Sequence, residues 1–557
     1  MNKKYAIGLD FGSLSVRALI IDAATGKEIA SAVEKYLHGF IEETLPETGE
    51  KLPIAWTLQD PQDYLYSMSQ TIKNAIKKAG IDVRNIVGLG IDFTACTVLP
   101  IKKDGTPLCF LPEFKNNKHA FVKLWKHHAA QDQANRINEL AKQRGEKWLP
   151  RYGKKISSEW LFAKILQILE EAPEVYDAMD RFIEATDWII MQLTGVATCN
   201  NCAAGYCAMW QKQEGYPSNE FFKALDPRLE NVVDEKLSRN VDFIGSKAGE
   251  ITEEAAKLFG LNPGTAVAVG NVDAHVAVPA VGINEPGSML MIIGTSTCHL
   301  ILSKEEKLIP GICGYVEDGI LPGMLGYQAG QSCVGDHFDW FVNNCVPTKY
   351  KEDAQKKGMI IYEYLRGKAK LQKPGESGLV ALDWWNGNRT VLVDTNLTGM
   401  MLGMTLLTKP EEMYRALIEA TAYGTRIIIE TFEKGGLPIN NLYACGSIAV
   451  KDDLIMQIYA DVMNREIRIS SSTQTMALGA AMYGAVAAGS SKGGYDSIID
   501  ASKVIPKINK RVYRPIKENV ETYNKLFAEY TVLHDYFGRG SNDVMKRLKN
   551  IKMQARD

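Results

Sequence analysis

The sequence has no excess of charge of either sign, no long apolar run and no regular cysteine pattern. Its 64 Lys and Arg residues nearly balance 66 Asp and Glu residues, for a formal net charge of -2. Such a chain has no strong field with which to hold nucleic acid or an anionic membrane. No segment approaches the roughly 18 apolar residues that a membrane span needs. These absences favour small molecules as partners, with no nucleic acid and no membrane.

The cysteines do not have the spacing of a disulfide framework, although there are 10 of them in 557 residues. The apolar run near the start is interrupted by Asp10 before it reaches the length of a secretory leader. We therefore expect reduced thiols and a cytoplasmic location. Cys199 and Cys202 form a C-x-x-C with Cys207 nearby, but no second pair completes a zinc site, which disfavours a metal role.

The composition is that of a globular protein, with 46% hydrophobic and 23% charged residues. The length allows two large lobes or several smaller domains. Residues 5–36 predict a meander of three strands joined by turns. An amphipathic helix follows from Asp60 and Pro61 to Gly80, and the apolar run from Ile86 to Ile91 predicts a buried parallel strand after that crossover helix.

The second half repeats the strand, small-residue turn and strand of the N-terminus at 288–303, which suggests a duplication. The elements expected after it are a helix over 410–433, a strand over 441–445, a helix over 454–462, a strand over 466–470 and a helix over 476–488, together completing an α/β lobe. Gly and Pro cluster at 282–287, so we expect domains at 1–283 and 287–557, with a helical and loop insert over about 105–262. The basic tail after Gly538 predicts a surface helix.

Two turns that combine glycine with hydroxyl residues lie between apolar strands. Glycine lets the backbone approach closely, and N–H groups and hydroxyls donate to phosphate oxygens. One such turn is common as a plain turn, but two in matching positions predict a phosphate site. The residues are Gly12, Ser13 and Ser15 in the first turn, and Gly294, Thr295, Ser296 and Thr297 in the second.

Asp10 ends the first strand beside its turn. A carboxylate that faces a triphosphate is repelled unless a divalent cation lies between them, so Asp10 predicts a Mg2+ site. The alternative is an Asp that caps its own turn. Arg17 could reach a phosphate, or could form a surface ion pair.

Asp273 follows an apolar strand that precedes the second turn, a place typical of a cleft. In phosphoryl transfer to a hydroxyl, one acceptor must orient the hydroxyl and take its proton, and Asp273 is our candidate base. His275 is better explained as a core histidine. Gly446 and Ser447 join a strand to a helix, a geometry that can lay a flat base against bare backbone.

With these residues assembled, the chain resembles the FGGY carbohydrate kinases, and within them the ribulokinase branch, over essentially its whole length. The motifs that carry the resemblance are GLDFGSLSVRALIID, DFTACTVLP, EATDWI, AGYCAMW, GNVDAHVAVPAVG, IGTSTCH, AGQSCVGD, LDWWNGNRTVLVD and ALIEATAYGTR. The stretch DWWNGNR is the most specific to that branch.

The resemblance implies an α/β, two-lobed actin-like ATPase (ribonuclease H-like) fold with an interdomain cleft, sugar on the N-terminal lobe and ATP on the C-terminal lobe. It implies ATP with Mg2+ as cofactors, and transfer of the γ-phosphate to the terminal hydroxyl of a ketopentose, with L-ribulose as the expected substrate. It leaves open whether the chain forms a homodimer. By resemblance, Asp273 is the base, Asp10 serves the metal, the two turns hold phosphates and the Gly446 turn lies against adenosine. The residues it assigns to the sugar are Ala95, Cys207, Asp273 and Gln328.

This chain departs from the branch at Cys207, where Lys is usual, at Gln328, where Glu is usual, and at Ser447, where the second Gly of a pair is expected. A buried unpaired charge costs about 3–5 kcal/mol, so losing a cation and an anion together is milder than losing one. We hypothesise that Cys207 and Gln328 face each other and shape the pocket for a less polar or differently configured sugar.

Two other classes remain open on the sequence alone. A non-catalytic sugar sensor on the same fold would explain the departures, although Asp10, Asp273 and both turns are kept. An actin-like ATPase of the chaperone or filament class would share the turns, but the insert over 105–262 and DWWNGNR argue against it.

Overall fold

The computed structural model describes residues 3–46, 48–506 and 508–555. The chain forms two compact units. The first comprises Met1–Asn284, Gly314–Gly326 and Gln474–Lys507, and the second comprises Glu285–Cys313, Tyr327–Thr473 and Ile508–Asp557. Within the described residues, no helix is both long enough and apolar enough to cross a membrane.

The sheet of the first unit contains the predicted meander. The strands β1 (Tyr5–Phe11), β2 (Ser15–Asp22) and β3 (Glu28–Lys35) pair antiparallel in sequence. Helix α1 (Pro61–Ala79) then returns the chain to β5 (Ile86–Phe93), which pairs parallel to β1. The Asp60 side chain caps α1 at its N-terminus and Gly80, in the left-handed region, ends it. The predicted three-stranded meander and the predicted crossover helix leading to a parallel strand are therefore both confirmed.

The rest of this sheet continues beyond β5. β10 (Ala266–Ala268) pairs parallel to β5 and antiparallel to β9 (Lys247–Glu250), which gives the order β3-β2-β1-β5-β10-β9. A short strand, β11 (Asn271–Val272), also pairs parallel to β5 and leads into α10 (Asp273–Ala280). The carboxyl ends of β1, β5 and β11 therefore meet at one edge of the sheet.

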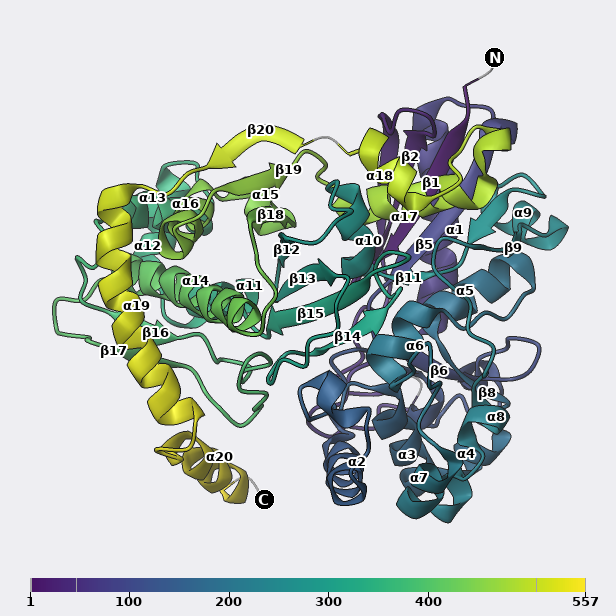
Figure 1. Ribbon diagram of the computed structural model, residues 1–557, viewed down its shortest axis with the longest axis horizontal. Coiled ribbons are helices and arrows are strands. Elements are labelled where there is room, and N and C mark those ends of the chain that lie inside the picture. Colours follow the sequence, from purple (N-terminus) through teal and green to yellow (C-terminus); the bar gives the residue numbers. More distant parts are fainter. Residues whose placement is uncertain (1–2, 47, 507, 556–557) are drawn as a thin grey trace. The chain divides into compact units, whose positions relative to one another are not determined.

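Helix α17 (Thr475–Ala488) packs against β1 and β5 (Figure 1). The expectation that this helix completes the second lobe is wrong, and glycines on the sheet give the physical reason. An added Cβ at Gly8, Gly88 or Gly90 would lie 1.8, 1.8 or 1.9 Å from a backbone oxygen of α17. Because glycine has no side chain, these positions let the backbone of α17 come this close to the strands. The small residues of α17 pack closely against the glycine-lined surface.

The insert is mainly helical, as predicted, and its strands β7 and β8 join β4 and β6, which precede it, in a small sheet in the order β4-β7-β6-β8. Its elements and those around it in the first unit are β4 (Leu58–Gln59), β6 (Val98–Ile101), β7 (Val122–Lys123), α2 (Gln131–Arg144), α3 (Leu161–Glu171), α4 (Pro173–Ala178), β8 (Arg181–Glu184), α5 (Ala185–Thr194), α6 (Asn201–Ala208), α7 (Asn219–Leu225), α8 (Val232–Lys236), α9 (Glu253–Phe259), β14 (Gly314–Glu317) and α18 (Ile498–Val504).

The sheet of the second unit repeats the order of the first. β12 (Ser288–Ile293) and β13 (Thr297–Ser303) form the predicted hairpin, β15 (Leu325–Gln331) lies beside β13, and β18 (Asn441–Cys445) pairs parallel to β12. β19 (Ile467–Ser470) and the antiparallel β20 (Ile508–Tyr513) follow, giving β15-β13-β12-β18-β19-β20. The four pairings from β2 to β9 and from β13 to β20 have the same senses in the two units, which supports the duplication inferred from the sequence.

Helices surround this second sheet, and the predicted helix over 410–433 is confirmed as α14. The predicted helix over 454–462 is α16, but a short α15 comes before it. The elements are α11 (Gly335–Asn344), α12 (Thr348–Lys356), α13 (Ile361–Lys370), β16 (Val380–Leu382), β17 (Met400–Leu402), α14 (Pro410–Lys434), α15 (Ser447–Lys451), α16 (Asp453–Met463), α19 (Lys517–Gly538) and α20 (Val544–Gln554).

Candidate active site

Carboxylates gather where the parallel strands of the first unit end. Asp10 on β1 lies opposite Asp92 on β5, and Asp92 lies opposite Asn271 on β11. Residues opposite one another on neighbouring strands project from the same face of a sheet. The strand edge therefore brings two carboxylates and an amide together, with Asp273 two residues beyond Asn271.

Asp10 is buried and has a cationic partner. Arg17 lies opposite it on β2, and the Arg17 guanidinium donates to the Asp10 carboxylate at 3.1 Å. Arg17 itself is about one-third exposed, with 36% of its side-chain surface open. The ion-pair alternative for Arg17 is therefore what the structure contains, and the pair lies directly beside the predicted phosphate turn.

The first phosphate turn is closed by its own backbone and anchored by Trp125 of the insert and by Gln59 of β4. The Gly12 N–H donates to the Ser15 carbonyl at 3.0 Å. The Ser13 hydroxyl accepts from the Trp125 indole at 3.1 Å, and the Ser13 carbonyl accepts from the Gln59 amide at 2.8 Å. These contacts fix the turn, and Ser15 begins β2 with its side chain buried.

Asp273 is the first residue of α10 and its side chain is partly exposed. One carboxylate oxygen accepts from the Ala274 N–H at 2.6 Å. Burial among protein atoms, with the charge of Asp10 as the next cause, raises the pKa of Asp273 to about 7. A carboxylate with such a pKa can take a proton near neutral pH, as a general base must.

Asp92 is a residue that the sequence reasoning did not assign to the site. It is fully buried, and burial followed by the charges of Asp10 and Asp273 raises the pKa of its carboxyl well above the usual value. The signal that could have found it is its position, because it follows the apolar run of β5 just as Asp10 follows the run of β1.

His275 and the C-x-x-C cysteines lie in the packed interior or beside it. Cys202 contacts His275 Nδ1 at 2.9 Å, and the His275 ring lies 4.4 Å from that of Tyr206. Cys199 contacts the Tyr216 hydroxyl at 3.4 Å instead. Among the residues that the structure describes, no group of three or more His, Cys, Asp or Glu side chains is placed to hold a metal ion.

Two of the residues that resemblance assigns to the sugar, Ala95 and Cys207, lie near the buried side chain of Lys164. Cys207 on α6 is buried, with its sulfur 2.7 Å from that of Cys96. Lys164, also buried, donates to the Cys96 carbonyl at 2.5 Å and to the Leu124 carbonyl at 2.9 Å. Ala95, next to Cys96, is partly exposed. Sequence reasoning missed Lys164, which lies within an apolar helix and has no motif around it.

In the second unit, the predicted phosphate turn and the predicted adenosine turn lie together. The Gly294 N–H donates to the Ser296 carbonyl at 2.9 Å, and the Gly335 N–H at the start of α11 donates to the Gly294 carbonyl at 3.0 Å. Gly446 has φ 95°, and an added Cβ there would lie 2.5 Å from the Ile293 carbonyl oxygen. Glycine is thus required where β18 ends beside the turn.

The exposure of the second turn suits a ligand contact. The side chains of Thr295 and Ser447 are exposed, and that of Ser296 is partly exposed. Gln328 on β15 is partly buried, and its amide nitrogen lies 3.5 Å from the Cys298 sulfur. The second unit therefore offers backbone and hydroxyl donors on one side of its sheet end.

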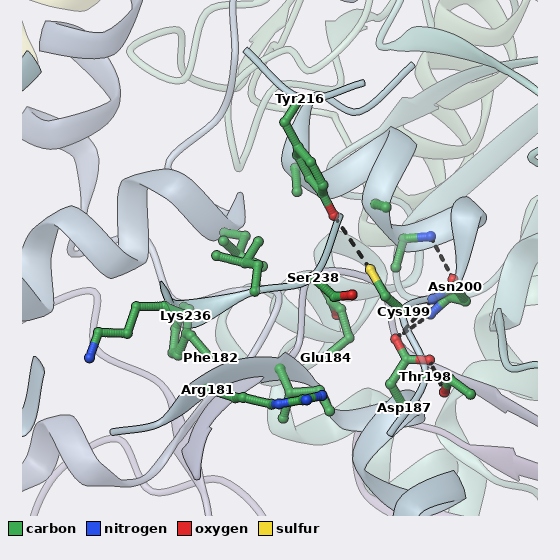
Figure 2. A pocket seen from close by; sticks show the side chains of 16 residues that line it. Arg181, Phe182, Glu184, Asp187, Thr198, Cys199, Asn200, Tyr216, Lys236 and Ser238 are labelled. Atoms are coloured by element: carbon green, nitrogen blue, oxygen red, sulfur yellow. Dashed lines mark hydrogen bonds between the residues drawn. The ribbon is translucent and has the colours of Figure 1, made fainter. Parts of the chain in front are cut away.

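A separate small cavity lies in the insert of the first unit (Figure 2). Its volume is about 40 Å³, which is room for water molecules only. Asp187, on its wall, accepts from the Thr198 hydroxyl at 2.7 Å and from the Asn200 amide at 2.8 Å. Burial raises the pKa of Glu184, another wall residue, to about 8. None of the predicted site residues lines this cavity.

Comparisons with known proteins match both halves of the chain. Residues 5–280 match the N-terminal domain of the FGGY family of carbohydrate kinases, and residues 289–488 match its C-terminal domain. The ribulokinase of Anoxybacillus flavithermus is 57% identical over 100% of this chain and 98% of its own, and that of Geobacillus thermodenitrificans is 56% identical with the same coverage.

A solved structure agrees on the fold. The xylulose kinase of Lactobacillus acidophilus superposes with a TM-score of 0.78 at 18% identity, covering 96% of this chain and 99% of its own. The expected α/β, two-lobed actin-like ATPase fold is therefore confirmed. With matching models over both halves and relatives above 50% identity along the full length, this chain belongs to the FGGY family of carbohydrate kinases.

Proposed function

We propose that this enzyme transfers the γ-phosphate of ATP to the terminal hydroxyl of a ketopentose, L-ribulose. The observation that carries the proposal is the carboxylate edge of the first unit, where Asp273 has a pKa of about 7 beside Asp10 and a glycine-hydroxyl turn. The names of relatives above 50% identity support ribulose as the sugar. A reaction that consumes ATP and a metabolic sugar is in keeping with the cytoplasm as its location.

Asp273 would orient the attacking hydroxyl and accept its proton. The turns at Gly12 and Gly294 would donate to phosphate oxygens, and Gly446 would leave bare backbone for adenine. Charge stabilisation from fixed donors of this kind supplies most of the catalysis in phosphoryl transfer. By the family resemblance, Ala95 and Gln328 would each contact the sugar.

Mg2+ fits the residues at the strand edge. Its preferred ligands are carboxylate and phosphate oxygens with water, and one or two carboxylates are enough. Asp10 is buried with its carboxylate at the edge of the sheet, and Asp92 next to it has no hydrogen-bond partner among the described residues. Asp10 would hold the ion, which when bound neutralises charge on the phosphate oxygens.

A coupled ADP-release assay over a panel of pentuloses, hexuloses and polyols tests the proposal. We expect ATP consumption that depends on sugar and is fastest with L-ribulose, and almost none when the sugar is omitted. Binding of a sugar without ATP consumption by any member of the panel would favour the non-catalytic sensor, which the departures at Cys207 and Gln328 motivate. Hydrolysis independent of sugar would favour the chaperone or filament class.

The departures at Cys207 and Gln328 give a prediction about specificity. If the two side chains act on one sugar, Cys207→Lys alone adds a charge to a buried position that already lies near Lys164, at a cost of about 3–5 kcal/mol. The double variant with Gln328→Glu supplies the opposite charge. We expect the single variants each to raise the KM for L-ribulose at least about tenfold, and the double variant to recover most of that loss.

The KM for ATP serves as the internal control, because neither residue is proposed to contact the nucleotide. Effects of the two substitutions that simply add, within about 0.5 kcal/mol, would show that the side chains act independently. The hypothesis that they face one another would then be wrong.

We further propose a homodimer. Residues 397–408 carry no charge, and among the strands that the structure describes β17, which lies within them, pairs with β16 alone. Leu402, Met404, Leu406 and Leu407 are exposed there. A free strand edge without charge can pair with a second copy of itself about a two-fold axis. Sedimentation equilibrium tests this proposal, and a monomer at micromolar concentration would contradict it.

A further inference from the structure

We propose that Asp92 supplies a second carboxylate to the cation held at Asp10, so that β1 and β5 bind the ion together. This inference rests on the proposed function for the phosphate that completes the ion's ligands. It assigns a cation-binding role to Asp92, which belongs to neither of the glycine-hydroxyl turns and is not the proposed base.

The first observation is that Asp92 is buried without a hydrogen-bond donor in the described part of the chain, and the side chain acting on it most directly is another carboxylate, that of Asp10. Its exposure is 0%, and neither of its carboxylate oxygens has a hydrogen-bond donor among the residues that the structure describes. Leaving a buried polar group unsatisfied costs about 1–3 kcal/mol, and more when the group is charged. This chain satisfies Asp187, a comparably buried carboxylate, with Thr198, Asn200 and a backbone N–H. The lack of hydrogen-bond donors around the Asp92 carboxylate is therefore specific to this position and is not general for buried carboxylates of this chain.

The second observation is where Asp92 lies. It stands in register with Asp10 on the neighbouring parallel strand, so the two carboxylates share one face of the sheet end. The hydroxyls of Thr94 and Thr97, just beyond it, bond each other at 2.9 Å and do not donate to Asp92. No described hydroxyl or amide therefore competes with an ion for its oxygens.

The third observation concerns charge. Arg17 is the cation at this edge, and it donates to Asp10 from β2, on the side away from β5. Asp10 is thus partly compensated, whereas Asp92 adds a second acid to which no cation of the described part of the chain is bonded. Mg2+ commonly takes two carboxylates together with phosphate oxygens and water, and this pair meets that requirement. The competing explanation is that Asp10 and Asp92 share a proton, as adjacent carboxyls can.

Binding of Mn2+ as the probe ion separates the two explanations. Electron paramagnetic resonance titrations would compare the wild-type protein, Asp92→Asn and Asp22→Asn, each with and without ADP. Asp22 is the matched control, because it ends β2 of the same sheet and accepts from the N–H groups of Ala24 and Thr25. We expect Asp92→Asn to weaken Mn2+ binding at least tenfold and Asp22→Asn to leave it within twofold of the wild type.

Mn2+ affinity within twofold of the wild type in a folded Asp92→Asn protein would overturn the inference and favour a shared proton, which an amide replaces well. Asp92→Ser repeats the test with a smaller side chain if the Asp92→Asn protein does not fold.

Asp10→Asn combined with Asp92→Asn gives a further check, since two ligands of one ion show losses of affinity that do not add. Because Mn2+ binding needs no turnover, a wild-type protein that binds Mn2+ but phosphorylates no sugar would reject the proposed function and leave this inference standing.

Discussion

Replacing Asp273 with Asn is expected to lower kcat by roughly 100- to 10,000-fold, the range typical of losing a general base. The amide keeps the shape of the side chain and can still accept from the Ala274 N–H, which the carboxylate does at 2.6 Å. It cannot take the proton of the sugar hydroxyl. Initial rates of ADP release with saturating sugar and ATP measure the effect.

The pH dependence of kcat/KM is the companion measurement. Burial and the charge of Asp10 raise the pKa of Asp273 to about 7, so the active, deprotonated form increases as the pH rises through 7. We expect kcat/KM of the wild-type enzyme to climb from pH 6 and to level off above about pH 8. The residual activity of Asp273→Asn should lack this rise. Ordinary turnover in the variant would remove the assignment of Asp273 as the base.

Replacing Gly88 with Val is expected to destabilise the first unit by about 3 kcal/mol or more, at the upper end of overpacking effects. An added Cβ at Gly88 would lie 1.8 Å from the Gly484 carbonyl oxygen, which belongs to the backbone of α17 and cannot rotate away. The helix must therefore move off the sheet, which exposes the apolar face of β5. Urea unfolding followed by tryptophan fluorescence measures the loss.

Gly367→Ala is the control for that experiment. Gly367 lies inside α13, and an added Cβ there meets nothing within 4 Å. Because alanine is better than glycine inside a helix by about 0.5–1 kcal/mol, we expect this variant to be slightly more stable than the wild type. Equal stability of the two variants would contradict the close approach of α17 to the sheet.

Local patterns in the sequence were enough to predict the hairpins, α1 and the long α14. In each case the signal lies within the element, as alternation or as a helical repeat with its caps at Asp60 and Gly80. The location of α17 could not be obtained in this way. Its small residues fit a sheet surface lined by Gly8, Gly88 and Gly90, hundreds of residues away in the chain, and nothing near 475–488 identifies that surface.

The candidate site likewise contains some residues that local sequence predicts and others whose surroundings depend on the fold. Asp10 and Asp273 could be predicted because each follows an apolar strand beside a recognisable motif. The environment of Cys207 could not, because it depends on a thiol from the loop after β5 and on Lys164 from α3. Register between strands also has no sequence signature, which is why the alignment of Asp92 with Asp10 emerges only from the fold.

The return of α17 to the first sheet has a consequence for biosynthesis. A nascent chain that has emerged from the ribosome only as far as α10 already contains β1, β5 and β10, yet their glycine-lined face stays uncovered until residues beyond 474 follow. The N-terminal half therefore cannot mature as an independent module during translation. Truncated transcripts and early translational arrest should yield a product that chaperones hold or proteases remove, whereas the full-length polypeptide closes that face last.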